Sequence, residues 1–270
     1  MTIHPRKALL KLCSIMLLIC AEMIFSSVSY AQSKLQSVEA LFKEGMPYSE
    51  MRKALSDAGW LPLRDPMCWE NTGDQATVCT ELPETESCSS DGYCNLNFAN
   101  AVEQKSIRIG TYGDYSQWNK ENGKGNFTVR FWEISAIPAP KETASCPSDN
   151  FDLFLKSFAS DATVKVAFTN PLVKVSELVE TEDAGYTDRF VYMLRINYND
   201  FNIINKNNEY HFVSYEGNID TDPLPLEISD EGKGRKLVRY QYGMSEGNSY
   251  LFEFKNDCWY LTEDPEPPSP

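Results

Sequence analysis

The chain has 270 residues, with 39 acidic and 25 basic side chains and a formal net charge of −14. A surface with this excess of carboxylates repels nucleic acid and anionic membranes, because both are bound through clustered lysine and arginine. We therefore expect no nucleic-acid partner. The charge favours a soluble protein that meets basic partners, and the length is enough for two modest hydrophobic cores.

Residues 1–31 have the organisation of a secretory signal peptide. Two basic residues near the start are followed by the apolar run 12–21, and small residues then stand at Ser29 and Ala31, where a signal peptidase cuts. The apolar run is too short to span a bilayer. Cleavage after Ala31 leaves 22 basic and 38 acidic residues, a net charge of −16. We expect a periplasmic or secreted protein without stable membrane insertion once the signal is removed.

The first unit, residues 32–136, is expected to contain two helices followed by three strands. The helices are indicated by apolar residues at helical spacing, and the strands by alternating apolar and polar residues. The expected elements are helices over 35–42 and 47–58 and strands over 94–98, 106–112 and 127–134. In the last strand, Phe127, Val129 and Phe131 are expected on one face. Two helices must then cover one face of a small sheet.

Residues 137–145 are expected to be a linker, because its prolines favour extended backbone. The second unit, residues 146–262, is expected to begin with a helix that carries an apolar stripe from Phe151 to Phe158, with Ser148 and Asp149 as candidate caps. A short second helix follows Asp161, and strands dominate from there. The alternating segments are 190–196, 210–214, 238–242 and 250–254.

The end of the chain is expected to contain a hairpin and a tail. A tight turn at Asn256-Asp257 joins the last alternating segment to residues 258–261. Residues 263–270, rich in proline and acid, are expected to form a flexible tail. The pattern as a whole predicts an α+β protein of two small disulfide-bonded domains, each with helices packed on an antiparallel sheet, which is curved in the second domain.

Six cysteines lie beyond the signal peptide, and an even number in an exported chain predicts disulfide bonds. They are Cys68, Cys79, Cys88, Cys94, Cys146 and Cys258. Sequence alone leaves fifteen pairings open. We expect two bonds among the first four cysteines, and a Cys146–Cys258 bond that joins the ends of the second domain. A zinc site from the first four has no C-x-x-C spacing and needs free thiolates, so we assign no metal.

Two stretches resemble known families. The Gly-Met opening of residues 45–60 resembles that of small two-helix, three-strand modules in bacterial envelope proteins, including the halves of β-lactamase inhibitor protein and small outer-membrane-assembly lipoproteins. This likeness extends over residues 32–136 and implies a binding module without catalytic residues. Residues 151–172, together with the terminal Cys-Trp-Tyr-Leu at 258–261, are similar to an uncharacterised family of exported bacterial domains. That likeness implies a cone-like α+β fold related to the nuclear-transport-factor-like group.

Residues 243–247 read Gly-Met-Ser-Glu-Gly and match the G-x-S-x-G nucleophile elbow of serine hydrolases. An elbow needs a strand, a sharp turn and then a helix, whereas strand residues lie on both sides of this segment. No histidine follows Ser245, and His211 is the single histidine beyond the signal peptide. We expect a hairpin loop at Ser245 and a surface or packed role for His211.

Two groups of acids are candidates for a chemical site. Asn218, Asp220 and Asp222 alternate as in a calcium loop, but Pro223 and Ser229 stand where an EF-hand needs glycine and glutamate. We expect a solvated turn there. The second group consists of Glu177, Glu180, Glu182 and Asp183. Two carboxylates held at the right separation can cleave glycosides, but we expect these acids in a loop.

We assign no catalytic or cofactor-binding residue and expect a non-catalytic binding protein. Its specific form is an inhibitor or immunity protein against an envelope-acting enzyme. We expect a protein partner, and a basic surface on that partner would complement the acidic chain. The first alternative is a pocket for a small ligand or a cell-wall fragment in the second domain, which is rich in tyrosine and phenylalanine. Two others are an envelope-assembly scaffold and a hydrolase that uses acids or Ser245.

Overall fold

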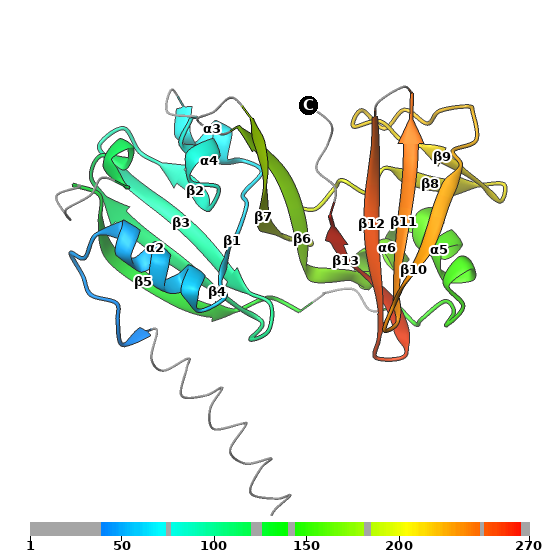
Figure 1. Ribbon diagram of the computed structural model, residues 1–270, viewed down its shortest axis with the longest axis horizontal. Helices are drawn as coiled ribbons and strands as arrows, with labels where there is room; N and C mark the ends of the chain where they lie inside the picture. Colours follow the sequence, from blue (N-terminus) through cyan, green and yellow to red (C-terminus); the bar gives the residue numbers. More distant parts are fainter. Residues whose placement is uncertain are drawn as a thin grey trace, which may run out of the picture.

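The structure is a computed structural model, and it describes residues 39–73, 77–119, 126–139, 144–180, 185–243 and 246–265. The expected signal peptide, the first half of the expected helix over 35–42 and most of the expected tail lie outside the described residues. The protein is α+β and consists of two sheets with a few helices (Figure 1). Within the described part of the chain, no helix has the length and apolar character that a bilayer span requires.

The first unit is a five-stranded antiparallel sheet with a helix lying across one face (Figure 1). Strands β1, β3, β4 and β5 follow one another in the sheet, and β2 pairs with β3. The elements are α2 (Tyr48–Asp57), β1 (Leu61–Pro62), α3 (Cys68–Thr72), α4 (Val78–Glu81), β2 (Thr85–Cys88), β3 (Tyr93–Asn100), β4 (Lys105–Tyr112), the 3-10 turn η2 (Tyr115–Gln117) and β5 (Thr128–Ala136).

Helix α2 forms where its apolar spacing predicts it. Tyr48, Met51 and Leu55 recur at intervals of three and four, so they share one face of the helix and are fully buried against the sheet. Burial of each such side chain contributes roughly 1.5–3 kcal/mol. The helix stops before Gly59, which has a φ of +83°, a conformation that costs glycine little. The sheet face beneath α2 is therefore the core face of the first unit.

The expected loop between α2 and β3 contains four short elements that the sequence did not indicate. Each has two to five residues, which is too few for a helical or strand period to be recognised in the sequence. Disulfide bonds link three of the four. The Cys68–Cys79 bond ties α3 to α4, and the Cys88–Cys94 bond ties β2 to β3. All four cysteines are thus paired within the first unit.

The expectation that Phe131 shares a face with Phe127 and Val129 is wrong. Phe127 and Val129 are buried, but 51% of Phe131 is exposed. The register between β4 and β5 shifts between Gly110 and Thr111, and this bulge adds one residue to β5. Since strand side chains alternate, one extra residue moves Phe131 to the opposite face of the sheet.

The second unit is a six-stranded sheet in the order β10-β11-β12-β13-β6-β7, with a separate β8-β9 pair. In Figure 1, α5 and α6 lie beside the strands β10 to β12. The elements are α5 (Phe151–Ser160), α6 (Ala162–Phe168), β6 (Thr169–Glu180), β7 (Tyr186–Leu194), β8 (Ile203–Lys206), β9 (Glu209–Phe212), β10 (Leu226–Gly232), β11 (Arg235–Tyr242), β12 (Glu246–Lys255) and β13 (Cys258–Asp264).

Several details of the second unit differ from the sequence expectation. The helix α5 is capped by Asn150, whose Oδ1 accepts from the Leu153 N–H at 3.1 Å, rather than by Ser148 or Asp149. The sheet is not wholly antiparallel, because β13 and β6 start from the same end and pair in parallel. Strand β13 also continues through the buried Asp264, two residues into the expected tail.

Aromatic side chains fill the space between the helices and the sheet of the second unit. Phe154 and Phe158 of α5 meet Phe252 of β12 at ring-centroid distances of 6.1 and 5.3 Å, and both contacts are edge-to-face. The Cys146–Cys258 bond joins the start of the unit to its last strand. Asn256 and Asp257 have φ values of 50° and 59° and form the tight turn between β12 and β13, as their sequence predicts.

Candidate functional site

The structure pairs the cysteines of the first unit and places strands on both sides of the G-x-S-x-G segment. The four cysteines weighed as zinc ligands are bonded in pairs and offer no thiolate. Across the described ranges, no group of three or more histidine, cysteine or acidic side chains is placed to hold a metal ion. Tyr242 pairs with Glu246 across the G-x-S-x-G segment, and a strand follows instead of the helix that an elbow needs. Ser245 itself lies outside the described residues.

His211 lies in β9 and contacts the largely exposed turn that carries the acids near residue 220. His211 is 8% exposed, and its Nδ1 lies 3.2 Å from the backbone oxygen of Asp222. Asp220 accepts from the Tyr242 hydroxyl at 2.8 Å and from the Asp222 N–H at 3.2 Å, and the Tyr242 bond is the main cause of its lowered pKa. The carboxylate of Asp220 therefore accepts hydrogen bonds from β11 and from its own turn.

Glu177 was expected in a loop, and that is wrong. It lies in β6, where its Oε1 accepts from Arg64 Nε at 2.7 Å and its Oε2 accepts from Arg189 Nη2 at 2.9 Å. Burial raises the pKa of Glu177, but the hydrogen bonds and charges of Arg64 and Arg189 outweigh burial and hold that pKa below its ordinary value. Glu180 ends β6 and is exposed, whereas Glu182 and Asp183 lie outside the described residues.

This Glu177 cluster connects the two units. Arg64 Nη1 donates to the backbone oxygen of Cys79 at 2.6 Å, and Arg189 Nη1 donates to that of Thr80 at 2.8 Å. The Leu63 N–H donates to Asn97 of β3, and the next N–H, that of Arg64, donates to Tyr192 of β7. Residues 63–64 thus hydrogen-bond to both sheets, and Glu177 has a structural partner set rather than a catalytic one.

The outer face of the first sheet, opposite α2, carries exposed aromatic side chains. Tyr93, Tyr112 and Phe131 are 55%, 38% and 51% exposed. The Tyr93 and Tyr112 rings are 4.6 Å apart, and the Arg130 guanidinium lies 5.2 Å from the Tyr112 ring centroid. We call these four residues the aromatic patch. Among the described residues, α2 covers only the other face of this sheet, so the patch is open to solvent.

Gly110 makes room for one ring of the patch. A Cβ atom at Gly110 would lie 2.0 Å from Cε1 of Phe131, so the Phe131 ring lies directly over the glycine backbone. An aromatic ring that covers a glycine on the neighbouring strand protects the exposed sheet and holds the ring flat. The Phe131 ring of the patch is therefore held in a defined position.

Polar and charged residues border the aromatic patch along the same face. Arg108 donates to Glu86 at 3.0 Å, and Asn97 donates to the other Glu86 oxygen at 3.0 Å. Glu133 of β5 is in register with Arg108. With Arg130, this face carries two positive and two negative side chains, so it is close to neutral within a strongly acidic chain.

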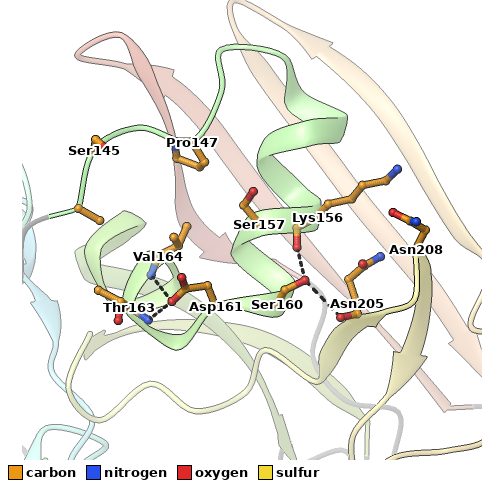
Figure 2. A pocket seen from close by; sticks show the side chains of 11 residues that line it. Ser145, Pro147, Lys156, Ser157, Ser160, Asp161, Thr163, Val164, Asn205 and Asn208 are labelled. Carbon is orange, nitrogen blue, oxygen red and sulfur yellow. Dashed lines mark hydrogen bonds between the residues drawn. The ribbon is translucent and has the colours of Figure 1, made fainter.

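Hollows in the second unit lie around α6 rather than inside the aromatic core. One hollow, of about 680 Å³, has a mixed polar and apolar lining and is bordered by α5, α6 and the β8-β9 turn (Figure 2). In Figure 2, Ser160 Oγ donates to the backbone oxygens of Lys156 and Asn205 at 2.7 and 3.2 Å. Two further hollows, of about 310 and 470 Å³, continue along α6 towards residues 195–201. The tyrosine and phenylalanine side chains of this unit mostly form its core.

No family model matches the chain, and no curated protein matches its sequence. Among solved structures, the chain is similar to an NTF2-like protein from Bacteroides fragilis NCTC 9343, with 12% sequence identity and a TM-score of 0.31. The match covers 61% of this chain and 60% of that one.

Proposed function

We propose that this is an exported, non-catalytic binding protein that docks a protein partner on the outer face of its first sheet. The observation that carries the proposal is the aromatic patch of Tyr93, Tyr112, Arg130 and Phe131, whose rings are about half-exposed and contact one another or the strand beneath them. Tyrosine and arginine are over-represented among the residues that dominate protein–protein binding energy. Large aromatic side chains left open on one face mark interaction sites.

The shape and border of this face favour a protein over a small molecule. The patch lies on a sheet surface and not in one of the three hollows described above, which lie in the second unit. Its border holds the Arg108–Glu86 pair and Glu133, which supply polar contacts of both signs around an apolar centre. Apolar centres with polar rims are typical of protein interfaces.

An inhibitor or immunity protein against an envelope-acting enzyme is the specific form of this proposal. Three disulfide bonds support work in an oxidising compartment outside the cytosol. The chain has a net charge of −14, and such a charge steers a basic partner towards the protein from a distance. Contact itself would then be made by the nearly neutral patch.

The test compares the full mature chain with a Tyr93→Ser/Tyr112→Ser variant. Each chain is used to capture proteins from an envelope extract, and the captured partner is purified so that its Kd can be measured with both chains. Loss of one contact residue of this kind costs about 2 kcal/mol, so we expect binding to weaken at least about 30-fold. The control is Tyr186→Ser on β7, which removes another tyrosine of similar exposure.

Two results would overturn the proposal. One is a partner that binds the patch variant as tightly as the unaltered chain. The other is a partner whose affinity falls equally in the Tyr186→Ser control, because the effect would then not belong to this face. Circular dichroism of each variant shows whether the fold is kept, which is expected because both patch tyrosines point to solvent.

A further inference from the structure

A hollow beside α6 combines two positive side chains with an apolar wall, and it is independent of the aromatic patch. Its two adjoining parts measure about 470 and 310 Å³ and share Lys165, Asn199 and Phe201. It lies between α6 and residues 195–201, the segment that leads from β7 towards β8. Hollows of a few hundred cubic ångströms are large enough for small organic ligands.

The two positive side chains of the hollow, Lys165 and Arg195, lack counterions. Within the described residues neither forms an ion pair, although seven such pairs occur elsewhere. Burial lowers the pKa of both groups, as expected for cations that leave water without a carboxylate beside them. Asp161, the one acid among the described lining residues, accepts from the N–H groups of Thr163 and Val164 at the start of α6.

Arg195 has a donor left over. Its Nη1 donates to the backbone oxygen of Thr169 at 3.3 Å, but its Nε is buried and has no hydrogen-bond partner among the described residues. Lys165 Nζ lies 5.1 Å from the Phe201 ring centroid, a cation–π contact that replaces only part of its hydration. A buried donor on a cation is costly to leave unpaired, and a bound anion would satisfy it.

The rest of the hollow is apolar and partly open. Phe201 lies at its base, while Val166 and Ile196 at its rim are 41% and 83% exposed. We propose that the hollow binds a small amphipathic anion. Its carboxylate or phosphate head contacts Lys165 and Arg195, and its aliphatic tail lies along the three apolar side chains.

The test is calorimetric titration of the full mature chain with four probes: octanoate, octyl phosphate, octanol and inorganic phosphate. We expect one-to-one binding of octanoate or octyl phosphate, and at least tenfold weaker binding of octanol and inorganic phosphate, which lack one half of the ligand. The stronger of the first two probes identifies the head group. Lys165→Met and Arg195→Gln should each weaken binding about tenfold, since each removes a charged hydrogen-bond donor.

Matched controls separate this site from general charge and folding effects. Lys43→Met makes the same charge change at an exposed position in the first unit and should leave affinity unchanged. Ile196→Ser removes tail contact at a side chain too exposed to affect folding, and should weaken binding severalfold. In the unaltered chain, NMR signals of residues 162–169 and 195–201 should shift on titration. The proposal is overturned if octanol binds as tightly as octanoate, if both cation variants keep full affinity, or if the shifts lie elsewhere.

Discussion

The Glu177→Gln substitution removes one negative charge from the cluster that joins the two units. Glu177 Oε1 and Oε2 accept from Arg64 at 2.7 and 2.5 Å, and Oε2 accepts from Arg189 at 2.9 Å. The exposed fraction of the side chain is only 16% for Arg64, 21% for Glu177 and 22% for Arg189. Breaking a buried pair costs about 3–5 kcal/mol and breaking an exposed one under about 1 kcal/mol, so we expect a loss of about 2 kcal/mol here.

The loss should depend on pH in a defined direction. Burial raises the pKa of Glu177, but Arg64 and Arg189 outweigh it and leave that pKa below the ordinary value of 4.5. A carboxylate with a lowered pKa in the folded state stabilises fully above its unfolded pKa, and this stability is lost as the pH falls through the folded pKa. The variant should therefore be less stable at pH 7, and the difference should shrink as the pH falls below 4.5.

Scanning calorimetry at pH 7 and at acid pH measures this difference. A loss of about 2 kcal/mol corresponds to a fall in Tm of about 4–8 °C for a chain of this size. Glu180→Gln, at the exposed end of the same strand, makes an identical chemical change away from the cluster. Equal Tm values for Glu177→Gln and the unaltered chain, or an equal fall in the Glu180→Gln control, would refute the role given to the cluster.

Three further changes test other parts of the structure. Replacing Cys146 and Cys258 together by alanine opens a bond that spans 112 residues, and urea unfolding should show a loss of about 2–5 kcal/mol; an unchanged midpoint contradicts a stabilising bond. Burial lowers the pKa of Lys165, so the stability of the unaltered chain relative to Lys165→Met in urea unfolding should rise as the pH increases from that lowered pKa towards 10.5; a difference that does not change with pH contradicts the burial of this charge. Gly110→Ala should displace the Phe131 ring, and NMR should show the loss of ring contacts at residue 110; a ring that stays in place disproves its position over the glycine.

Local patterns predicted the elements whose residues interact with near neighbours in the chain. Tyr48, Met51 and Leu55 define a helix face by spacing alone, and Asn256-Asp257 defines a hairpin by turn preference. In both cases, the information lies within about ten residues. The Cys146–Cys258 bond was also expected, although its span is long, because it follows from the position of two cysteines at the ends of one unit.

Features that depend on distant residues could not be predicted in this way. Glu177 looked like a loop acid because its partner Arg64 lies 113 residues earlier in the chain, and no local pattern records that contact. The face of Phe131 depends on a bulge next to Gly110, which is a property of pairing between two strands. The aromatic patch was missed for the same reason, since Tyr93 and Tyr112 meet only through the register of β3 and β4. A glycine in a strand pattern was the one signal that pointed to this region.

Long-range attraction and direct contact are assigned to different parts of this protein. The chain is strongly acidic, yet the aromatic patch has balanced charges around it, with Arg108 and Arg130 against Glu86 and Glu133. Net charge acts mainly on the rate of association, whereas buried aromatic contacts act mainly on dissociation. A partner therefore needs a basic surface to be attracted but an apolar one to stay bound. This combination favours recognition of a folded protein with both features over non-specific binding of any cation.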